Sequence, residues 1–107
     1  MADAWGALAQ VQPSASTLTD GYTVPVGKRA TVFVSMANSG AAAMVRLSHA
    51  IAGAGDALKQ YYLYDYALDA NDTQATVRFT ANATDVLRVY SDTGDVVFQF
   101  NGIEEDA

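Results

Sequence analysis

Side chains that could do acid–base or metal chemistry are few in this sequence. It contains one histidine, His49, and no cysteine. The lack of cysteine excludes thiolate catalysis, Cys-type zinc sites and disulfides, and one histidine excludes a multi-histidine metal site within one chain. His49 alternates with apolar residues, which indicates a core or interface position. The alternative is a trimer axis, where three copies would meet around a metal or an anion and make the site pH-sensitive.

A polar segment at residues 69–72 carries the other candidate ligands. Asp69, Asn71 and Asp72, with Asp65 nearby, offer the oxygen atoms that Ca²⁺ prefers. The segment lacks the 12-residue spacing, the glycine and the distal glutamate of an EF-hand loop. A turn needs the same residue types, because Asn and Asp side chains hydrogen-bond to the neighbouring backbone. We therefore expect a turn here and no bound metal.

Motifs for catalysis are missing from the sequence. There is no G-x-S-x-G nucleophile elbow, and the glycines of the AGAGD segment have no lysine in the Walker position. Most carboxylates fall in predicted turns, whereas acid–base catalysis needs them in a cleft that separates their pKa values. We expect no catalytic residue and no cofactor, and hence a protein that is not an enzyme.

Tyrosines dominate one stretch of the chain. Tyr62, Tyr64 and Tyr66 are alternate residues of a predicted strand, so their rings are expected on one face. That face would be either an exposed binding surface or part of the core, with each hydroxyl at the edge. Both arrangements leave aromatic surface, which favours burial against another chain. The predicted interface consists of Tyr62, Tyr64, Tyr66, Val34, Met36 and Leu8.

The elements that must position these residues are strands, because the hydrophobic period along the chain is two. Ala30, Val32, Val34 and Met36, for example, share one face of a predicted strand. Gly27 and Gly94 lie in turns where φ > 0 is expected. The pattern predicts an all-β, antiparallel β-sandwich of seven or eight strands, with a jelly roll as one option. The predicted strands are residues 29–37, 43–51, 60–68, 73–80, 85–91 and 95–101.

The length of 107 residues indicates one domain. We divide it into an N-terminal segment, 1–21, and a β-sandwich domain, 22–107. Residues 6–12 could form a short edge strand, and the segment could alternatively be an arm that packs on a neighbouring subunit. The acidic C-terminus is expected to be a solvated tail.

Charge and hydropathy limit the partners. The formal net charge is -6, which disfavours binding to phosphate backbones, so we expect no nucleic acid partner. No apolar run reaches the ~20 residues that span a bilayer, so we expect no membrane partner. The N-terminus lacks the basic region of a signal peptide.

From Tyr22 to Ala30 the sequence YTVPVGKRA resembles a family of small virion proteins of tailed bacteriophages, whose members carry YTVPAGKRA. The similarity extends from about residue 8 to 105, and Val26 departs from the family's usual alanine. The other matching positions are Val32, Asn38-Ser39, Lys59-Gln60-Tyr61, Tyr64-Asp65, Leu68 to Thr73, Asp85 to Ser91, Val96, Phe98, Gly102 and Glu104.

The resemblance implies a structural protein of the virion, located on the capsid surface or the tail. The first expectation is a capsid decoration (cement) protein that binds between capsomers as a homotrimer at local threefold positions. Its partners would be the major capsid protein or other virion proteins. A tail-fibre or baseplate accessory module is the alternative within the virion. A carbohydrate-binding adhesin domain is the alternative outside it.

Overall fold

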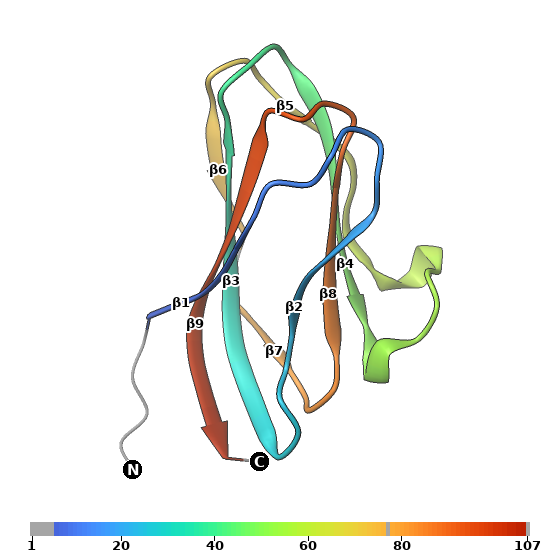
Figure 1. Cartoon of the computed structure of the whole chain (residues 1–107), viewed down its shortest axis with the longest axis vertical. Coiled ribbons are helices and arrows are strands. Elements are labelled where there is room, and N and C mark those ends of the chain that lie inside the picture. The colour runs from blue at the N-terminus through green and yellow to red at the C-terminus, as the bar shows by residue number, and fades with distance from the viewer. Residues whose placement is uncertain (1–5, 77, 107) are drawn as a thin grey trace.

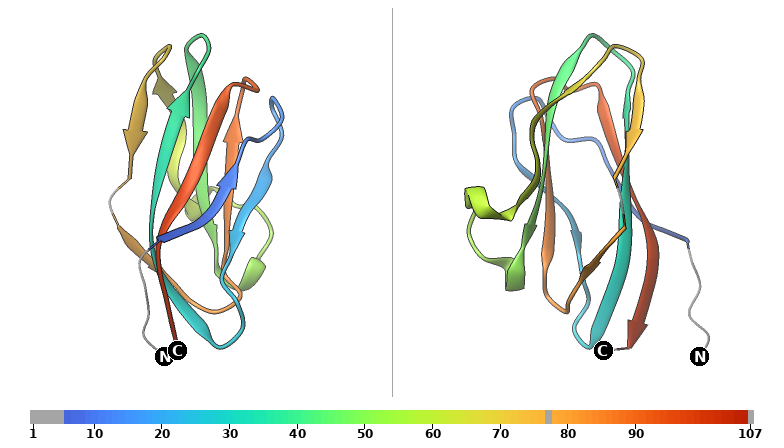
Figure 2. Two further views of the ribbon diagram at one scale, coloured as in Figure 1. Left: turned by 60° about the vertical axis from the view of Figure 1, so that its left-hand side comes forward. Right: turned by 180° about the vertical axis from the view of Figure 1, so that it is seen from behind.

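The computed structural model describes residues 6–76 and 78–106, and strands make up most of them (Figure 1). Within this part of the chain, nine strands form two antiparallel sheets that pack face to face (Figure 2). This confirms the predicted all-β sandwich. One sheet has the order β1-β9-β3-β6, with β7 also paired to β3, and the other has the order β2-β8-β4-β5. The strands are β1 (Gly6–Val11), β2 (Thr19–Thr23), β3 (Lys28–Asn38), β4 (Ala43–Ala50), β5 (Tyr61–Leu68), β6 (Thr73–Ala75), β7 (Phe79–Ala81), β8 (Val86–Ser91) and β9 (Val96–Asp106).

The strand pairing is nested, because strands from the first half of the chain pair with strands from the second half in reverse order. β1 pairs with β9, β2 with β8, β3 with β6 and β7, and β4 with β5. Successive strands from β1 to β4 alternate between the two sheets. This is the arrangement of a jelly roll, in which β6 and β7 together take the place of one strand.

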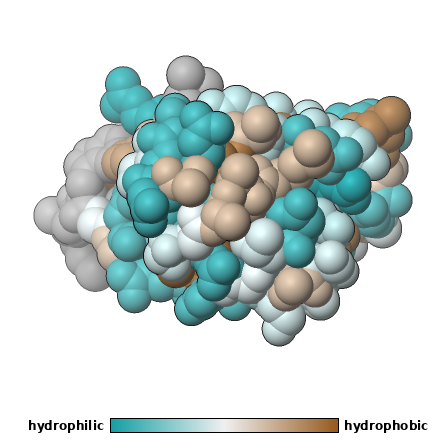
Figure 3. Space-filling view, turned by 90° about the horizontal axis from the view of Figure 1, so that it is seen from above, coloured by the Kyte–Doolittle hydropathy of each residue, from teal (hydrophilic) through white to brown (hydrophobic). Residues whose placement is uncertain are grey.

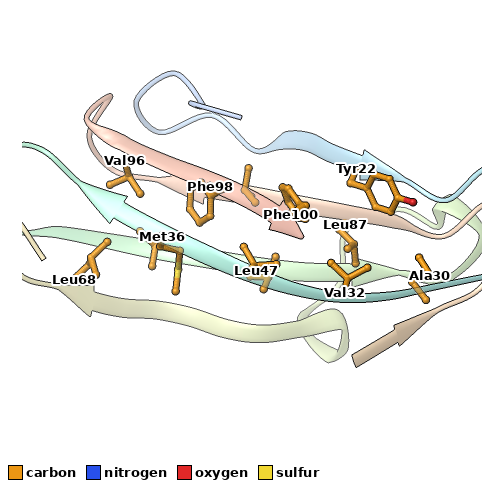
Figure 4. Packing of buried hydrophobic residues seen from close by; sticks show 14 of the residues in the cluster. Tyr22, Ala30, Val32, Met36, Leu47, Leu68, Leu87, Val96, Phe98 and Phe100 are labelled. Carbon is orange, nitrogen blue, oxygen red and sulfur yellow. The ribbon is translucent and has the colours of Figure 1, made fainter. Parts of the chain in front are cut away.

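The core lies between the sheets and follows the predicted alternation. The inward residues of β3 (Ala30, Val32, Val34 and Met36) are all buried. They pack with inward residues of β4, β8 and β9 (Figure 4). The largest fully buried side chains are Phe98 and Phe100 of β9.

β3 and β9 form the longest pairing, from Lys28 opposite Asp106 to Asn38 opposite Val96. β9 therefore runs beyond the predicted end at residue 101. The Tyr22 hydroxyl donates a hydrogen bond to Glu104, and Lys28 pairs with Asp106. The prediction of a solvated tail over the C-terminal EEDA, residues 104–107, is wrong for residues 104–106, because the eleven-residue strand β3 holds them in the sheet, and Ala107 lies outside the described residues.

The N-terminal part of the described chain belongs to the sandwich. β1 is the edge strand next to β9, which matches the edge-strand alternative for residues 6–12. The predicted boundary between residues 21 and 22 falls inside β2, a strand that the sequence pattern did not indicate. Residues 12–18 connect the two strands. The sandwich thus includes residues from Gly6 onward, and residues 1–5 lie outside the described residues.

The strand predicted at residues 73–80 is two short strands instead. β6 and β7 both pair with β3, and Thr76 lies in the gap between them. Its backbone N–H donates to the Val34 carbonyl, and its hydroxyl accepts a hydrogen bond from the Val34 N–H. The side chain of Thr76 therefore replaces part of the interrupted ladder.

Two predicted glycine conformations have different outcomes. Gly27, in the turn between β2 and β3, has φ of 78°, as expected. Gly94 is not among the residues with positive φ, so the prediction for the β8–β9 turn is wrong. The Gln12 side-chain amide donates to the Gly94 carbonyl, and the turn is therefore supported by a residue distant in sequence.

Between β4 and β5 the chain forms two 3₁₀ turns, η1 (Ile51–Gly53) and η2 (Leu58–Gln60).

Candidate functional site

The tyrosine strand β5 lies at the edge of its sheet, and its pairing with β4 is irregular. Tyr66 lies opposite Val45, Leu63 opposite Leu47 and Tyr61 opposite Ser48, with a register shift between each of these pairs. β5 therefore contains two extra residues relative to β4. Asp65, with φ of 53°, lies in the first of these bulges.

The bulges separate the three predicted interface tyrosines. Tyr62 and Tyr66 line the same cleft as Leu63, whereas Tyr64 packs against Arg46 elsewhere. The prediction that Tyr62, Tyr64 and Tyr66 share one face is wrong for Tyr64, because each extra residue reverses the alternation. Filling of the core by their rings is also wrong, since they are 49%, 51% and 39% exposed.

The cleft opens between β5 of one sheet and β6 and β7 of the other. It has a volume of about 300 Å³, and most of its lining is apolar. The ring of Phe79 on β7 lies 4.6 Å from that of Tyr62, so these two rings connect the sheets at the edge. The lining residues are Met36, Tyr62, Leu63, Tyr66, Gln74, Ala75, Thr76 and Phe79.

Tyr62 is held by a hydrogen-bonded series that begins in the interior. The nitrogen Nε2 of His49 lies 2.7 Å from the Asp85 carboxylate, and Nδ1 lies 3.0 Å from the Tyr62 hydroxyl. His49 shares the inward face of β4 with Val45 and Leu47, as predicted. Its partner Asp85 was not predicted, because the two residues are 36 positions apart and no motif connects them.

Asp85 is an anchor for several segments. Its carboxylate accepts hydrogen bonds from the backbone N–H groups of Ala52 in η1 and Asn82 before β8, as well as from His49. Burial alone would raise the pKa of Asp85. The three hydrogen bonds and the proximity of His49 outweigh it and lower the pKa below its ordinary value. The side chain is therefore a carboxylate at neutral pH.

The outer face of the second sheet carries a cation between two aromatic rings. The Arg46 guanidinium lies 4.3 Å from the centre of the Tyr64 ring and 4.5 Å from that of Tyr90. It also pairs with Asp65 at 2.7 Å. Tyr61 packs edge-on against Tyr64, which extends the aromatic surface toward η2. Aromatic and arginine side chains of this kind are enriched at protein interfaces.

The other predicted interface residues differ in position. Val34 and Met36 are 0% and 2% exposed and lie between the sheets, so they are core residues and do not form surface in the isolated chain. The pattern placed them on a face correctly, but that face packs against the second sheet. Met36 reaches the wall of the cleft. Leu8, on the edge strand β1, is partly buried against the core.

The polar segment at residues 69–72 is a turn. Asn71 has φ of 58°, and the Asp72 N–H donates to the Asp69 carbonyl. The Asp72 carboxylate accepts hydrogen bonds from the Thr73 N–H and from the Gln74 side chain. Among residues 6–76 and 78–106, no group of three His, Cys, Asp or Glu side chains is placed to hold a metal ion.

No protein-family model and no curated protein matches this chain. In the part of the chain that the structure describes, no helix has the length and apolar character to cross a bilayer. The candidate functional site is therefore the β5 edge, with its cleft, its aromatic rings and the His49–Asp85 pair.

The hydrogen bond at Tyr62 can be tested by removing its hydroxyl. Tyr62→Phe keeps the ring against Phe79 but leaves Nδ1 of His49 without its donor. We expect the free energy of unfolding to fall by about 0.5–1.5 kcal/mol, measured by urea denaturation. Tyr64→Phe is the matched control, since the Tyr64 hydroxyl has no hydrogen-bond partner among residues 6–76 and 78–106, and it should change stability less. An equal effect of both variants would contradict the role of the series.

Proposed function

We propose that this protein is a structural protein of a tailed-bacteriophage virion, specifically a capsid decoration protein that binds between capsomers and to the major capsid protein. The resemblance that begins at Tyr22–Ala30 supports the virion assignment. The observation that carries the mechanism is the apolar cleft at the β5 edge, which keeps Tyr62 and Tyr66 half-exposed. In this proposal an apolar group of a neighbouring subunit fills the cleft.

Burial of this surface can contribute to the binding energy. Removing apolar surface from water contributes about 25 cal/mol per Å², so each ~100 Å² that is buried gains roughly 2.5 kcal/mol before the costs of association. Many copies on one particle would add such contacts together. The decoration protein would thereby resist the outward pressure of packaged DNA without any bond-making chemistry.

The charge distribution agrees with a position outside the DNA-filled shell. The chain has a net charge of -6. Three of its cations are already paired with carboxylates, Lys28 with Asp106, Arg46 with Asp65 and Arg88 with Asp20. Such a surface gains little from phosphate and repels other acidic surfaces, which would keep decorated particles apart.

The end of the sandwich formed by the β3–β4, β5–β6 and β8–β9 turns has a mixed surface. Figure 3 looks onto this end and shows a small area of moderately hydrophobic residues surrounded by hydrophilic ones. It lacks the apolar lining of the cleft. We therefore propose that the contact with the shell lies at the β5 edge and that the protein binds as a homotrimer.

Tyr66→Ala tests the contact. Shells stripped of the protein are incubated with each variant, and bound protein is measured after sedimentation. Loss of one wall of the cleft should weaken binding about tenfold, the cost of removing an aromatic interface anchor. Tyr64→Ala is the control on the same strand, similarly exposed but outside the cleft, and should bind nearly as the wild type. A stronger effect of Tyr64→Ala would move the contact to the outer face of the second sheet.

Copy number tests the function itself. Quantitative mass spectrometry of purified virions should find hundreds of copies per particle. A few copies would instead identify a tail-fibre or baseplate accessory module. Absence from virions, with binding on a glycan array, would identify a carbohydrate-binding adhesin domain, in which Tyr64 and Arg46 would form the stacking surface. Sedimentation of the isolated protein tests the trimer.

A further inference from the structure

Tyr62 differs from its neighbours in one chemical respect. It is 49% exposed, and Tyr64 on the same strand is 51% exposed, so a small reagent in solution reaches both residues. Only Tyr62 of this pair has its hydroxyl at a histidine nitrogen in the described structure. The two side chains therefore form a natural comparison of one tyrosine with a base and one without.

The direction of each hydrogen bond follows from Asp85. A carboxylate only accepts, so Nε2 of His49 carries a hydrogen and donates it to Asp85. In the neutral imidazole Nδ1 then holds a lone pair, and the Tyr62 hydroxyl must donate to it. Asp85, His49 and Tyr62 thus have the relation of orienting carboxylate, base and nucleophile.

The surroundings hold this arrangement in place and leave room beside it. The Asp85 carboxylate, 3% exposed, is fixed by hydrogen bonds from the Ala52 and Asn82 N–H groups. Its own hydrogen bond with Nε2 in turn orients the imidazole of His49. A surface hollow of about 230 Å³ adjoins the base and the hydroxyl. It is lined by His49, Ile51, Lys59, Gln60, Tyr61 and Tyr62.

We propose that Tyr62 is a covalent modification site, an acyl acceptor for small activated acyl donors, with His49 as the general base. The Tyr62 oxygen forms a bond to the acyl carbon as its proton passes to Nδ1 of His49. The bond between the acyl carbon and the leaving group then breaks, and the proton passes from His49 to the leaving group. The products are an O-acyl tyrosine and the protonated leaving group, and Asp85 stabilises the imidazolium between the two proton transfers.

The base is needed because the phenolate is scarce. Burial, and secondarily the charge of Asp85, raise the pKa of Tyr62. Spontaneous ionisation is therefore less available to Tyr62 than to a free tyrosine, and faster acylation of Tyr62 than of Tyr64 would have to come from His49. General-base assistance typically contributes 10²–10⁴-fold. This inference does not depend on the proposed function in the virion.

N-acetylimidazole is the probe, used on the full-length protein at neutral pH in limiting amount. Cleavage after Lys59 and Arg78 yields one peptide, residues 60–78, that contains both tyrosines. Fragment ions then give the acetylation rate of each. We expect Tyr62 to react at least about tenfold faster than Tyr64. Hydroxylamine should remove the label, as it does from a tyrosine ester but not from a lysine amide.

His49→Gln supplies the second comparison. Glutamine can accept the Tyr62 hydrogen bond but cannot take up its proton, so Tyr62 should fall to the rate of Tyr64 while Tyr64 is unchanged. Equal rates for the two tyrosines in the wild type would overturn the proposal. So would a fast Tyr62 in a folded His49→Gln protein. If urea titration shows that the His49→Gln variant is already unfolded without urea, the comparison of Tyr62 with Tyr64 in the wild type alone tests the proposal.

Discussion

Gly102→Ala is expected to destabilise the fold severely. Gly102 lies in the middle of a sheet, between Gly6 of β1 and Val32 of β3. A Cβ at this position would lie 1.9 Å from the carbonyl oxygen of Thr31 and 2.9 Å from its carbonyl carbon. Both atoms belong to the backbone, so no side-chain rotation relieves the contact.

The cost of this substitution is large because either strand could move only by breaking the ladder between β3 and β9, the longest pairing in the fold. We expect a loss of about 4 kcal/mol or more, against a total stability of roughly 5–15 kcal/mol for a domain of this kind. In urea the midpoint should fall by about 2 M if the protein remains soluble.

Gly94→Ala is the matched control. It lies in the turn before β9, its φ is not positive, and no atom lies within 4 Å of the added Cβ. Its stability should stay within about 0.5 kcal/mol of the wild type. A Gly102→Ala protein that unfolds at the wild-type midpoint would show that the backbones of β3 and β9 do not approach each other this closely.

The sequence pattern predicted the regular strands and missed the features that depend on pairing. Alternation located β3, β4 and β8 to within a residue or two, because one side of each faces the core along its whole length. β2 was missed, because its sequence, TDGYT, contains little apolar alternation. Its place in the sheet comes from pairing with β8.

The same distinction explains the candidate site. The alternate spacing of the tyrosines implied one aromatic face. The bulges in β5 change this, and they are defined by the register of β5 against β4. Their one local sign is the positive φ of Asp65, which is a property of the structure and not of the sequence. Likewise, His49 was recognised as an inward residue from its neighbours on β4. Its contact with Asp85 arises from the topology that brings β4 beside β8. The aromatic surface was therefore predictable, and its division between the cleft and the outer face was not.

Asp85→Asn is expected to be the most damaging polar substitution in the cluster. Asp85 is buried and accepts from Ala52 N at 2.8 Å, Asn82 N at 2.9 Å and His49 Nε2 at 2.7 Å. An asparagine offers one acceptor oxygen, and its NH₂ group would face an N–H donor. At least one buried donor loses its partner, and the charge-assisted bonds are lost. We expect a loss of about 2–4 kcal/mol in urea denaturation.

Asp106→Asn is the control for loss of a carboxylate in an ion pair of the same length. Asp106 lies 2.7 Å from the Lys28 ammonium group, but its side chain is 88% exposed. Water screens an exposed pair of this kind and leaves it little net energy, so this variant should unfold close to the wild type. Equal losses in the two variants would indicate that burial of Asp85 carries no energetic weight.

The pH dependence gives an independent check with a fixed sign. The pKa of Asp85 in the folded protein lies below its ordinary value of 3.8, so the carboxylate stabilises the fold at pH values above 3.8. That contribution is lost progressively as the pH falls below this value, because the unfolded chain then takes up a proton at Asp85 while the folded carboxylate still resists it, and the loss is complete below the folded pKa. The stability difference between wild type and Asp85→Asn should therefore be constant near neutral pH and shrink below about pH 4. A difference that grows on acidification would mean that the folded protein binds the Asp85 proton more tightly than the unfolded chain, which is incompatible with three donors facing one carboxylate.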